Sequence, residues 1–241
     1  MSGPTLDIQP DAQAAAAKAC DLLADSIASA VAQRGRALIA LAGGTTPAAV
    51  YRLLAERDLD WGSVLLVPGD ERCVPHGHPD ANLTMIEREL LDRLPIGGGR
   101  PEYVGPPLGL PPSVAAPAWE RALVDALNQS AAEGLPVIDF ALLGLGLDGH
   151  TASLFPGSDS LDAEGIAVAI EDAPKPPPQR VSLTLELLAI ARSRVILAVG
   201  ESKADAIARV LEGPSPLWPA SLLPGEGTLV ICDERAVGVT P

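Results

Sequence analysis

The sequence predicts an α/β fold in which helices cover both faces of a mostly parallel sheet. Short apolar runs of strand length alternate with longer segments that carry apolar residues at helical spacing, and this alternation is typical of strand–helix–strand units. Glycine-rich turns follow several of the apolar runs. With 241 residues and 47% hydrophobic residues, the chain can bury a large core. We expect residues 1–241 to form one domain.

The first half of the chain alternates helix and strand signals. Apolar residues such as Ala15, Leu22 and Ile27 recur at helical spacing, and the apolar run 37–41 ends before a glycine pair. Thr45 and Thr46 can cap the next helix, and a proline suits its first turn. The expected elements are a helix at 11–33, a strand at 37–41, a helix at 47–56, a strand at 64–67, a helix at 80–93 and a proline- and glycine-rich loop at 95–112.

The second half repeats the alternation. The apolar run 137–143 is interrupted only by Asp139 and predicts a buried strand, while the proline-rich segment 174–178 predicts a hinge or a surface loop. The expected elements are a helix at 115–131, strands at 137–143, 195–199 and 228–232, a helix at 184–193 and a helix that begins at 200–203.

Composition excludes several classes of protein. The net charge is −14, no basic stripe is visible, and we therefore expect no nucleic-acid partner. No apolar run approaches the ~20 residues that span a bilayer, and no basic segment followed by an apolar one begins the chain, so we expect neither a membrane partner nor export. The three cysteines are scattered, which favours a reducing cytoplasm. We expect a monomer.

Four strand ends carry unusual residues: Gly43 to Pro47, Asp70 to Arg72, Gly144 to His150 and Gly200 to Lys203. Because parallel strands end at the same edge of a sheet, these four segments are expected to lie together there, where α/β proteins bind ligands. The glycines let the backbone turn sharply and approach a ligand closely.

His150 is the strongest candidate for acid–base chemistry. Its unperturbed pKa of roughly 6.5 suits proton transfer near neutral pH, although a lone histidine is often a structural hydrogen-bonding group. Asp148 either orients His150 or caps the following helix, and both roles stay open. Asp70 can position a catalytic water or hold Arg72. No serine occupies a nucleophile elbow and no Cys–His pair is suggested, so a nucleophilic triad fits poorly.

Anion binding is the second function that these turns suggest. The turn of Gly43, Gly44, Thr45 and Thr46 leaves free N–H groups at a helix N-terminus, which favours phosphate; an ordinary capped turn is the alternative. Arg72, Arg180 and Lys203 can each contact a phosphate, although a solvated surface charge explains each equally simply. His76 and His78 lie beside Asp80 in a loop, and we interpret them as surface residues, so we expect no metal site.

Several motifs together resemble the 6-phosphogluconolactonase family, within the wider group that includes glucosamine-6-phosphate deaminases. After the histidine the deaminases read Gly-His-Ile-Ala-Phe-Asn-Glu-Pro, whereas this chain reads Gly-His-Thr-Ala-Ser-Leu-Phe-Pro-Gly, as the lactonases do, and lacks the acidic partner. The motifs that carry the resemblance are Leu41 to Pro47, Asp70 to Pro75, His78 to Asn82, Gly144 to Gly157, Arg180 to Thr184 and Gly200 to Lys203.

The resemblance implies a Rossmann-like, three-layer sandwich of the sugar-phosphate isomerase type. It implies hydrolysis of 6-phospho-D-glucono-1,5-lactone to 6-phospho-D-gluconate in the oxidative pentose phosphate pathway, without metal or organic cofactor. His150 would activate water, with Asp148 and Asp70 as further catalytic residues. Backbone N–H groups of the glycine loops would stabilise the oxyanion. The implied substrate-binding residues are Gly43, Gly44, Thr45, Thr46, Arg72, Asn82, Gly146, Gly149, Arg180 and Lys203. The alternatives are an amino-sugar phosphate isomerase or deaminase and a non-catalytic sugar-phosphate sensor.

Overall fold

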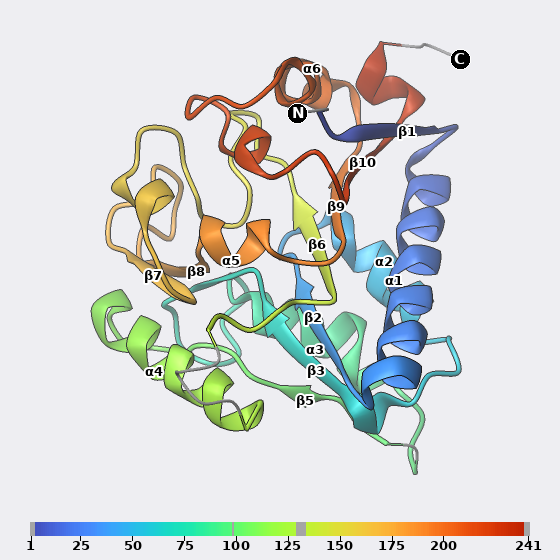
Figure 1. Ribbon diagram of the computed structural model, residues 1–241, viewed down its shortest axis with the longest axis vertical. Helices are drawn as coiled ribbons and strands as arrows, with labels where there is room; N and C mark the ends of the chain where they lie inside the picture. The colour runs from blue at the N-terminus through green and yellow to red at the C-terminus, as the bar shows by residue number, and fades with distance from the viewer. Residues whose placement is uncertain (1–2, 98, 129–133, 239–241) are drawn as a thin grey trace.

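Seven parallel strands form the central sheet of the computed structural model, which describes residues 3–97, 99–128 and 134–238 (Figure 1). Their order, β1-β10-β9-β6-β2-β3-β5, confirms the predicted parallel sheet. The predicted strands at 37–41, 64–67, 195–199 and 228–232 are all present within one residue at each end. The bounds are β1 Thr5–Gln9, β2 Ala37–Leu41, β3 Val64–Pro68, β5 Glu102–Tyr103, β6 Phe140–Gly144, β9 Arg194–Ala198 and β10 Thr228–Asp233.

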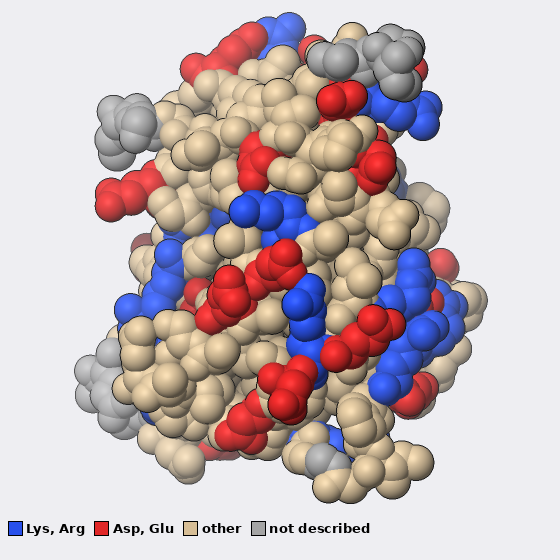
Figure 2. Space-filling model, turned by 90° about the vertical axis from the view of Figure 1, so that its right-hand side faces the viewer, with Lys and Arg blue, Asp and Glu red and all other residues tan. Residues whose placement is uncertain are grey.

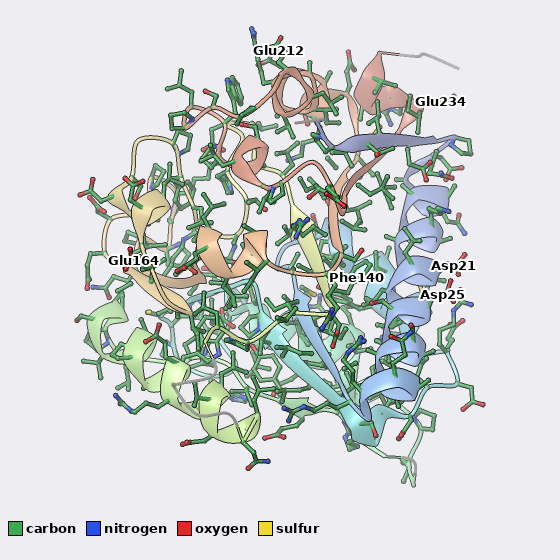
Figure 3. The ribbon with its side chains drawn as sticks, in the orientation of Figure 1. Asp21, Asp25, Phe140, Glu164, Glu212 and Glu234 are labelled. Atoms are coloured by element: carbon green, nitrogen blue, oxygen red, sulfur yellow. The ribbon has the colours of Figure 1, made fainter. Side chains whose placement is uncertain are left out.

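Helices cover both faces of this sheet, as predicted. One apolar cluster joins the large sheet to α1 (Ala12–Arg34), α2 (Thr46–Leu54) and α3 (Asn82–Glu89). A second cluster, on the opposite face, joins it to α4 (Pro112–Ala126), α5 (Leu185–Ala189) and α6 (Ala204–Glu212). Figure 1 shows α1 on one side of the sheet and α4 and α5 on the other. Figure 3 shows Phe140, which is 1% exposed, inside the molecule, with acidic side chains such as Glu164 at its outside.

A second, antiparallel sheet of three strands was not predicted. It contains β4 (Asp70–Arg72), β8 (Arg180–Leu183) and β7 (Ala167–Ile170) in the order β4-β8-β7. The charged triplet 70–72, expected as a turn after β3, is therefore itself a strand, in which Arg72 is paired with Arg180. This pairing brings two segments that are more than a hundred residues apart to the same edge of the large sheet.

Several predicted elements differ in length. The helix expected at 80–93 is α3 followed by a 3-10 turn, and the helix expected at 184–193 is only α5. The loop expected at 95–112 holds the two-residue strand β5, and α4 starts at its last residue. The predicted end of the helix at 115–131 lies outside the described residues from 129 onward. The 3-10 turns are η1 Trp61–Ser63, η2 Leu91–Arg93, η4 Asp159–Asp162, η5 Glu201–Lys203, η6 Pro219–Leu222 and η7 Glu234–Val237.

The described surface carries both signs of charge. Figure 2 shows acidic and basic side chains intermixed on the face that carries α1. Ion pairs account for part of this mixing, including Arg57 with Asp21 at 2.5 Å and Arg52 with Glu89 at 2.9 Å. Among the described helices, none has the length and apolar character needed to cross a membrane.

Candidate active site

Four adjacent strands, β9, β6, β2 and β3, end at the same edge of the large sheet and deliver the predicted turns to one cleft of about 300 Å³. The cleft lies where the chain turns to opposite faces of the sheet after the neighbouring strands β2 and β6. Open α/β sheets usually bind their ligands at such a point. The predicted site residues that line it are Gly43, Gly44, Thr45, Thr46, Asp70, Arg72, Gly146, His150, Arg180 and Lys203. Asn82, Asp148 and Gly149 do not line it.

The glycine-rich loop after β6 folds back on itself. The Gly146 N–H donates to the His150 carbonyl at 2.8 Å, and the Gly149 N–H donates to the Gly146 carbonyl at 3.0 Å. Both N–H groups are therefore engaged within the loop and are not free donors for an oxyanion. Gly149 has a φ of +75°, and Trp218 packs against it on the side away from the cleft. These glycines shape the loop.

His150 lines the cleft with a side chain that is 17% exposed. Its Nδ1 contacts the Asp148 carboxylate, which can only accept, so Nδ1 carries the proton and Nε2 is left as the basic nitrogen. The imidazole packs on Phe155, with the ring centroids 4.6 Å apart. Burial lowers the pKa of His150, and the hydrogen bond and charge of Asp148 partly oppose that shift. Neutral His150 is thus available to accept a proton.

Asp148 contacts His150, and this contact favours the orienting role over the capping role, the two that the sequence left open. The residues after His150 form turns and an isolated bridge, so no helix begins there for Asp148 to cap. Burial acts to raise the pKa of Asp148, but the hydrogen bond and charge of His150, together with the charge of Lys175, outweigh it and lower the pKa. The carboxylate therefore stays ionised beside the imidazole.

Asp70 and Arg180 form a buried pair, with side chains 8% and 4% exposed and 3.8 Å between Oδ2 and NH1. Ser153 Oγ bridges them, because it donates to Asp70 at 2.5 Å and accepts from Arg180 at 3.3 Å. Arg180 also donates to the carbonyls of Lys175 and Pro177. Asp70 thus faces Arg180 instead of Arg72, and most of the Arg180 donors hold the protein itself.

Arg72 and Asn82 both lie near the N-terminus of α3, which begins at Asn82. Arg72 donates from NH1 to the Asp80 carbonyl at 2.7 Å, whereas its Nε is buried and has no hydrogen-bond partner among the described residues. Asn82 is 2% exposed and donates to the backbone and the carboxylate of Asp70 at 2.7 and 3.1 Å. It packs against Gly43, where a Cβ would overlap its amide. Asn82 thus supports two residues of the cleft wall, Gly43 and Asp70, and its predicted contact with substrate stays a prediction.

The turn before α2 presents its backbone to the cleft. Its residues line the cavity, and the first N–H groups of a helix have no acceptor within the helix. Thr45 is the N-cap but its side chain makes no capping hydrogen bond, which corrects the expected capping role. Gly44 has a φ of +89°. The N-terminal end of α2 is therefore free to attract an anion.

Two lysines reach the cleft from different turns. Lys203 donates from Nζ to the Leu145 carbonyl at 2.5 Å, and burial lowers its pKa with a further contribution from the charge of Lys175. Lys175 was missed by the sequence reasoning, which treated 174–178 as a loop or hinge. Its Nζ lies 3.4 Å from Asp148 and 3.5 Å from His150 Nδ1. The only sequence signal was its position five residues before Arg180.

Glu71 is a buried charge of the triplet Asp70 to Arg72 to which the sequence analysis assigns no role of its own. It is 1% exposed, and its carboxylate accepts from the N–H groups of Arg72, Asn82 and Leu83 at 2.7–2.8 Å. Burial raises its pKa to about 7 against the effect of these hydrogen bonds. Glu71 points to the α3 N-terminus and does not line the cleft.

Metal ligands are not gathered at this site or elsewhere in the part of the chain that the structure describes, where no group of three or more His, Cys, Asp and Glu is placed to hold an ion. His76 instead contacts Glu87 at 3.3 Å, and His78 accepts from the Asp80 N–H at 3.1 Å.

Comparison with known proteins identifies the family. The family described as glucosamine-6-phosphate isomerases/6-phosphogluconolactonase matches residues 10–237. A 6-phosphogluconolactonase of Mycobacterium tuberculosis is 36% identical over 245 residues, covering 98% of each chain. The structure of 6-phosphogluconolactonase from Trypanosoma cruzi is similar with a TM-score of 0.84 and 27% identity, over 100% of this chain and 99% of that one. A monomeric glucosamine-6-phosphate deaminase shares the fold, with a TM-score of 0.78 and 21% identity over 98% of this chain and 100% of that one. This chain belongs to the glucosamine-6-phosphate isomerase/6-phosphogluconolactonase family.

Proposed function

We propose that the protein hydrolyses 6-phospho-D-glucono-1,5-lactone to 6-phospho-D-gluconate in the oxidative pentose phosphate pathway. The observation that carries the proposal is the oriented imidazole of His150, whose Nδ1 is held by Asp148 while the ring lines a cleft with cationic side chains. The relatives of similar length that carry the name 6-phosphogluconolactonase support the substrate. The cysteines are free, which agrees with a cytoplasmic location.

His150 Nε2 acts as the general base. It takes a proton from water as the water oxygen attacks the lactone carbonyl, and Asp148 stabilises the imidazolium that forms. When the tetrahedral intermediate collapses, the bond to the ring oxygen breaks and His150 returns the proton to that oxygen. The net change is the addition of one water and the formation of a carboxylic acid, which ionises. A lactone is already reactive, so no covalent intermediate is needed.

The reacting substrate carries negative charge on its phosphate and on the oxyanion that forms at the lactone carbonyl. The α2 N-terminus, Arg72 and Lys203 supply positive charge for these two groups. The first-turn N–H groups of α2 are donors that the helix leaves free, and the cationic side chains of Arg72 and Lys203 line the same cleft. Because the N–H groups of Gly146 and Gly149 are engaged, the N–H groups of the turn before α2 are the ones we assign to the oxyanion or the phosphate. Asp70 and Arg180 position the loop that carries Lys175.

The test compares wild type with His150→Asn on freshly generated lactone at mildly acidic pH, with spontaneous opening subtracted. We expect kcat to fall by ~10²–10⁴-fold in the variant while 6-phosphogluconate still binds, because general base catalysis contributes about that factor. Absence of acceleration by folded wild type would refute the lactonase proposal. Release of ammonia from glucosamine 6-phosphate by the same sample would favour the deaminase instead.

A further inference from the structure

Among the described residues, Lys175 is a cation whose side chain contacts both members of the Asp148–His150 pair and that the proposed mechanism does not use. Its Nζ lies 3.4 Å from each oxygen of the Asp148 carboxylate and 3.5 Å from Nδ1 of His150. It comes from the loop between β7 and β8, about 25 residues after the glycine-rich loop. Two independent parts of the chain therefore meet at this carboxylate.

The loop that carries Lys175 is fixed by buried groups. The Arg180 guanidinium donates to the Lys175 carbonyl at 2.8 Å and to the Pro177 carbonyl at 2.9 Å, and it is itself paired with Asp70. When an exposed surface lysine forms an ion pair, the entropy that its side chain loses offsets most of the free energy gained. Here Arg180 already fixes the backbone that carries Lys175, so the ion pair orders fewer degrees of freedom.

The charge of Lys175 acts on His150 in a defined direction. Because Nδ1 carries the proton that it donates to Asp148, and an ammonium group can only donate, Lys175 makes no hydrogen bond to the neutral imidazole. It repels the imidazolium and shares the carboxylate that would otherwise stabilise it. Without Lys175, the full charge of Asp148 would act on the imidazole and favour its protonated form, which cannot accept the proton of an attacking water.

The other groups around His150 do not replace this effect. Asp148 on the same loop and Asp70 on β4 both favour the imidazolium. Phe155 packs on the ring and contributes no charge, and the Arg180 guanidinium lies on Phe155, 5.6 Å from its centroid. Lys203 is held by the Leu145 carbonyl. In the part of the chain that the structure describes, Lys175 is the cation in direct contact with the Asp148–His150 pair.

We propose that Lys175 is a positioning residue that holds the Asp148 carboxylate and keeps His150 neutral, so that Nε2 is ready to accept a proton in mildly acidic solution. This inference rests on the proposed role of His150 as the base. It predicts an enzyme whose activity persists at a lower pH than an Asp–His pair alone would allow.

The experiment measures kcat/KM as a function of pH for wild type, Lys175→Met and Lys175→Arg, with Lys18→Met on α1 as a control that removes the same charge elsewhere. We expect the acidic limb of the Lys175→Met profile to move up by about one pH unit, so that activity near pH 5.5 falls ~10-fold and activity near pH 7.5 changes less than ~3-fold. Lys175→Arg and Lys18→Met are expected to keep the wild-type limb.

A higher KM at every pH with an unmoved limb would overturn the proposal, because it would assign Lys175 to substrate binding. A nitrogen-15 NMR titration of the His150 ring separates this proposal from that of the lactonase activity, since it needs no substrate. We expect the pKa of His150 to rise in Lys175→Met and the proton to stay on Nδ1 of the neutral ring. An unchanged titration would refute the role of Lys175 even in an active lactonase, and a shifted one would support it even in an inactive chain.

Discussion

Gly146 leaves the space that the His150 ring occupies, because glycine has no side chain. A Cβ at that position would overlap both the imidazole and the Asp148 carboxylate. The same residue donates its N–H to the His150 carbonyl, which closes the turn. At the scale of single residues, the glycine is therefore needed for close approach between backbone and ring.

Gly146→Ala is expected to displace the His150 ring and lower kcat/KM by ~10²-fold or more, because a misplacement of about 1 Å at a catalytic group has that effect. The overlap should also reduce the free energy of unfolding by about 1–3 kcal/mol. Steady-state kinetics and urea unfolding measure the two effects. Gly62→Ala is the matched control, since a Cβ there meets nothing closer than 3.6 Å. Activity of Gly146→Ala within ~3-fold of wild type would contradict this account of the loop.

The sequence predicted the residues of the glycine-rich loop better than those that reach it from elsewhere. His150 and Asp148 are two residues apart, so one loop fixes their contact. Lys175 reaches them only because β8 pairs with β4 and Arg180 holds the loop before it. No local pattern encodes that long-range contact. The resemblance places Asn82 in the site, but its packing against Gly43 and its hydrogen bonds to Asp70 join separate segments of the chain, which no local pattern shows.

At the scale of elements, β4 supplies the N-terminal cap of α3. Ala81, the N-cap residue, has no side chain that can accept a hydrogen bond. The carboxylate of Glu71 accepts from the N–H groups of Asn82 and Leu83 instead, and its charge complements the positive end of the helix. Asn82 in turn holds Asp70, so the cap connects the helix to the wall of the cleft.

The pKa of Glu71 predicts how stability changes with pH. Burial raises it from 4.5 to about 7, so folding takes up a proton between these values. Its contribution to stability is full below about pH 4.5 and is lost as the pH rises through about 7. We expect the free energy of unfolding of wild type to fall between these limits by on the order of 3 kcal/mol more than that of Glu71→Gln, which cannot ionise.

Urea unfolding at several pH values checks this prediction. Glu56→Gln, at an exposed position after α2, removes the same charge without touching α3 and should follow the wild-type curve. Curves for wild type and Glu71→Gln that run parallel from about pH 4.5 to pH 8 would show that Glu71 does not titrate in this range.

The predicted strands are marked by their own sequence, whereas the missed strands depend on pairing with distant segments of the chain. The strands of the large sheet that end at the site are mostly apolar runs of five residues, buried on both faces. Strands β4, β7 and β8 have three or four residues, and Asp70–Arg72 is entirely charged. These short strands form by pairing across distant segments, so their own composition does not reveal them. The edge strand β1 is missed for a related reason, since its residues are largely polar or exposed.

At the scale of the whole molecule, the large sheet separates two apolar clusters, and the cluster with α4 also includes the small sheet. Trp119 on α4 is fully buried in this cluster and donates from Nε1 to the Val104 carbonyl beside β5 at 2.9 Å. Val181 and Leu183 of β8 belong to the same cluster. This cluster therefore packs against both sheets, and we expect the two sheets to unfold as one unit.

Trp119→Phe tests whether the two sheets unfold together. The substitution removes one buried hydrogen bond and part of an indole, for an expected loss of about 1–3 kcal/mol in the free energy of unfolding. If the core is shared, native-state hydrogen exchange should show the same loss of protection for the most protected amides of β6 in the large sheet and of β8 in the small one.

Tyr51→Phe, in the cluster on the opposite face, provides the comparison, because it removes the hydrogen bond from its hydroxyl to the Ala42 carbonyl. It should also lower protection in both sheets equally if the protein is one cooperative unit. Loss confined to β8 in Trp119→Phe, with β6 unchanged, would mean that the small sheet opens as a separate unit. The Asp70–Arg180 pair would then join two units that unfold separately, and the cleft would lose its order before the large sheet unfolds.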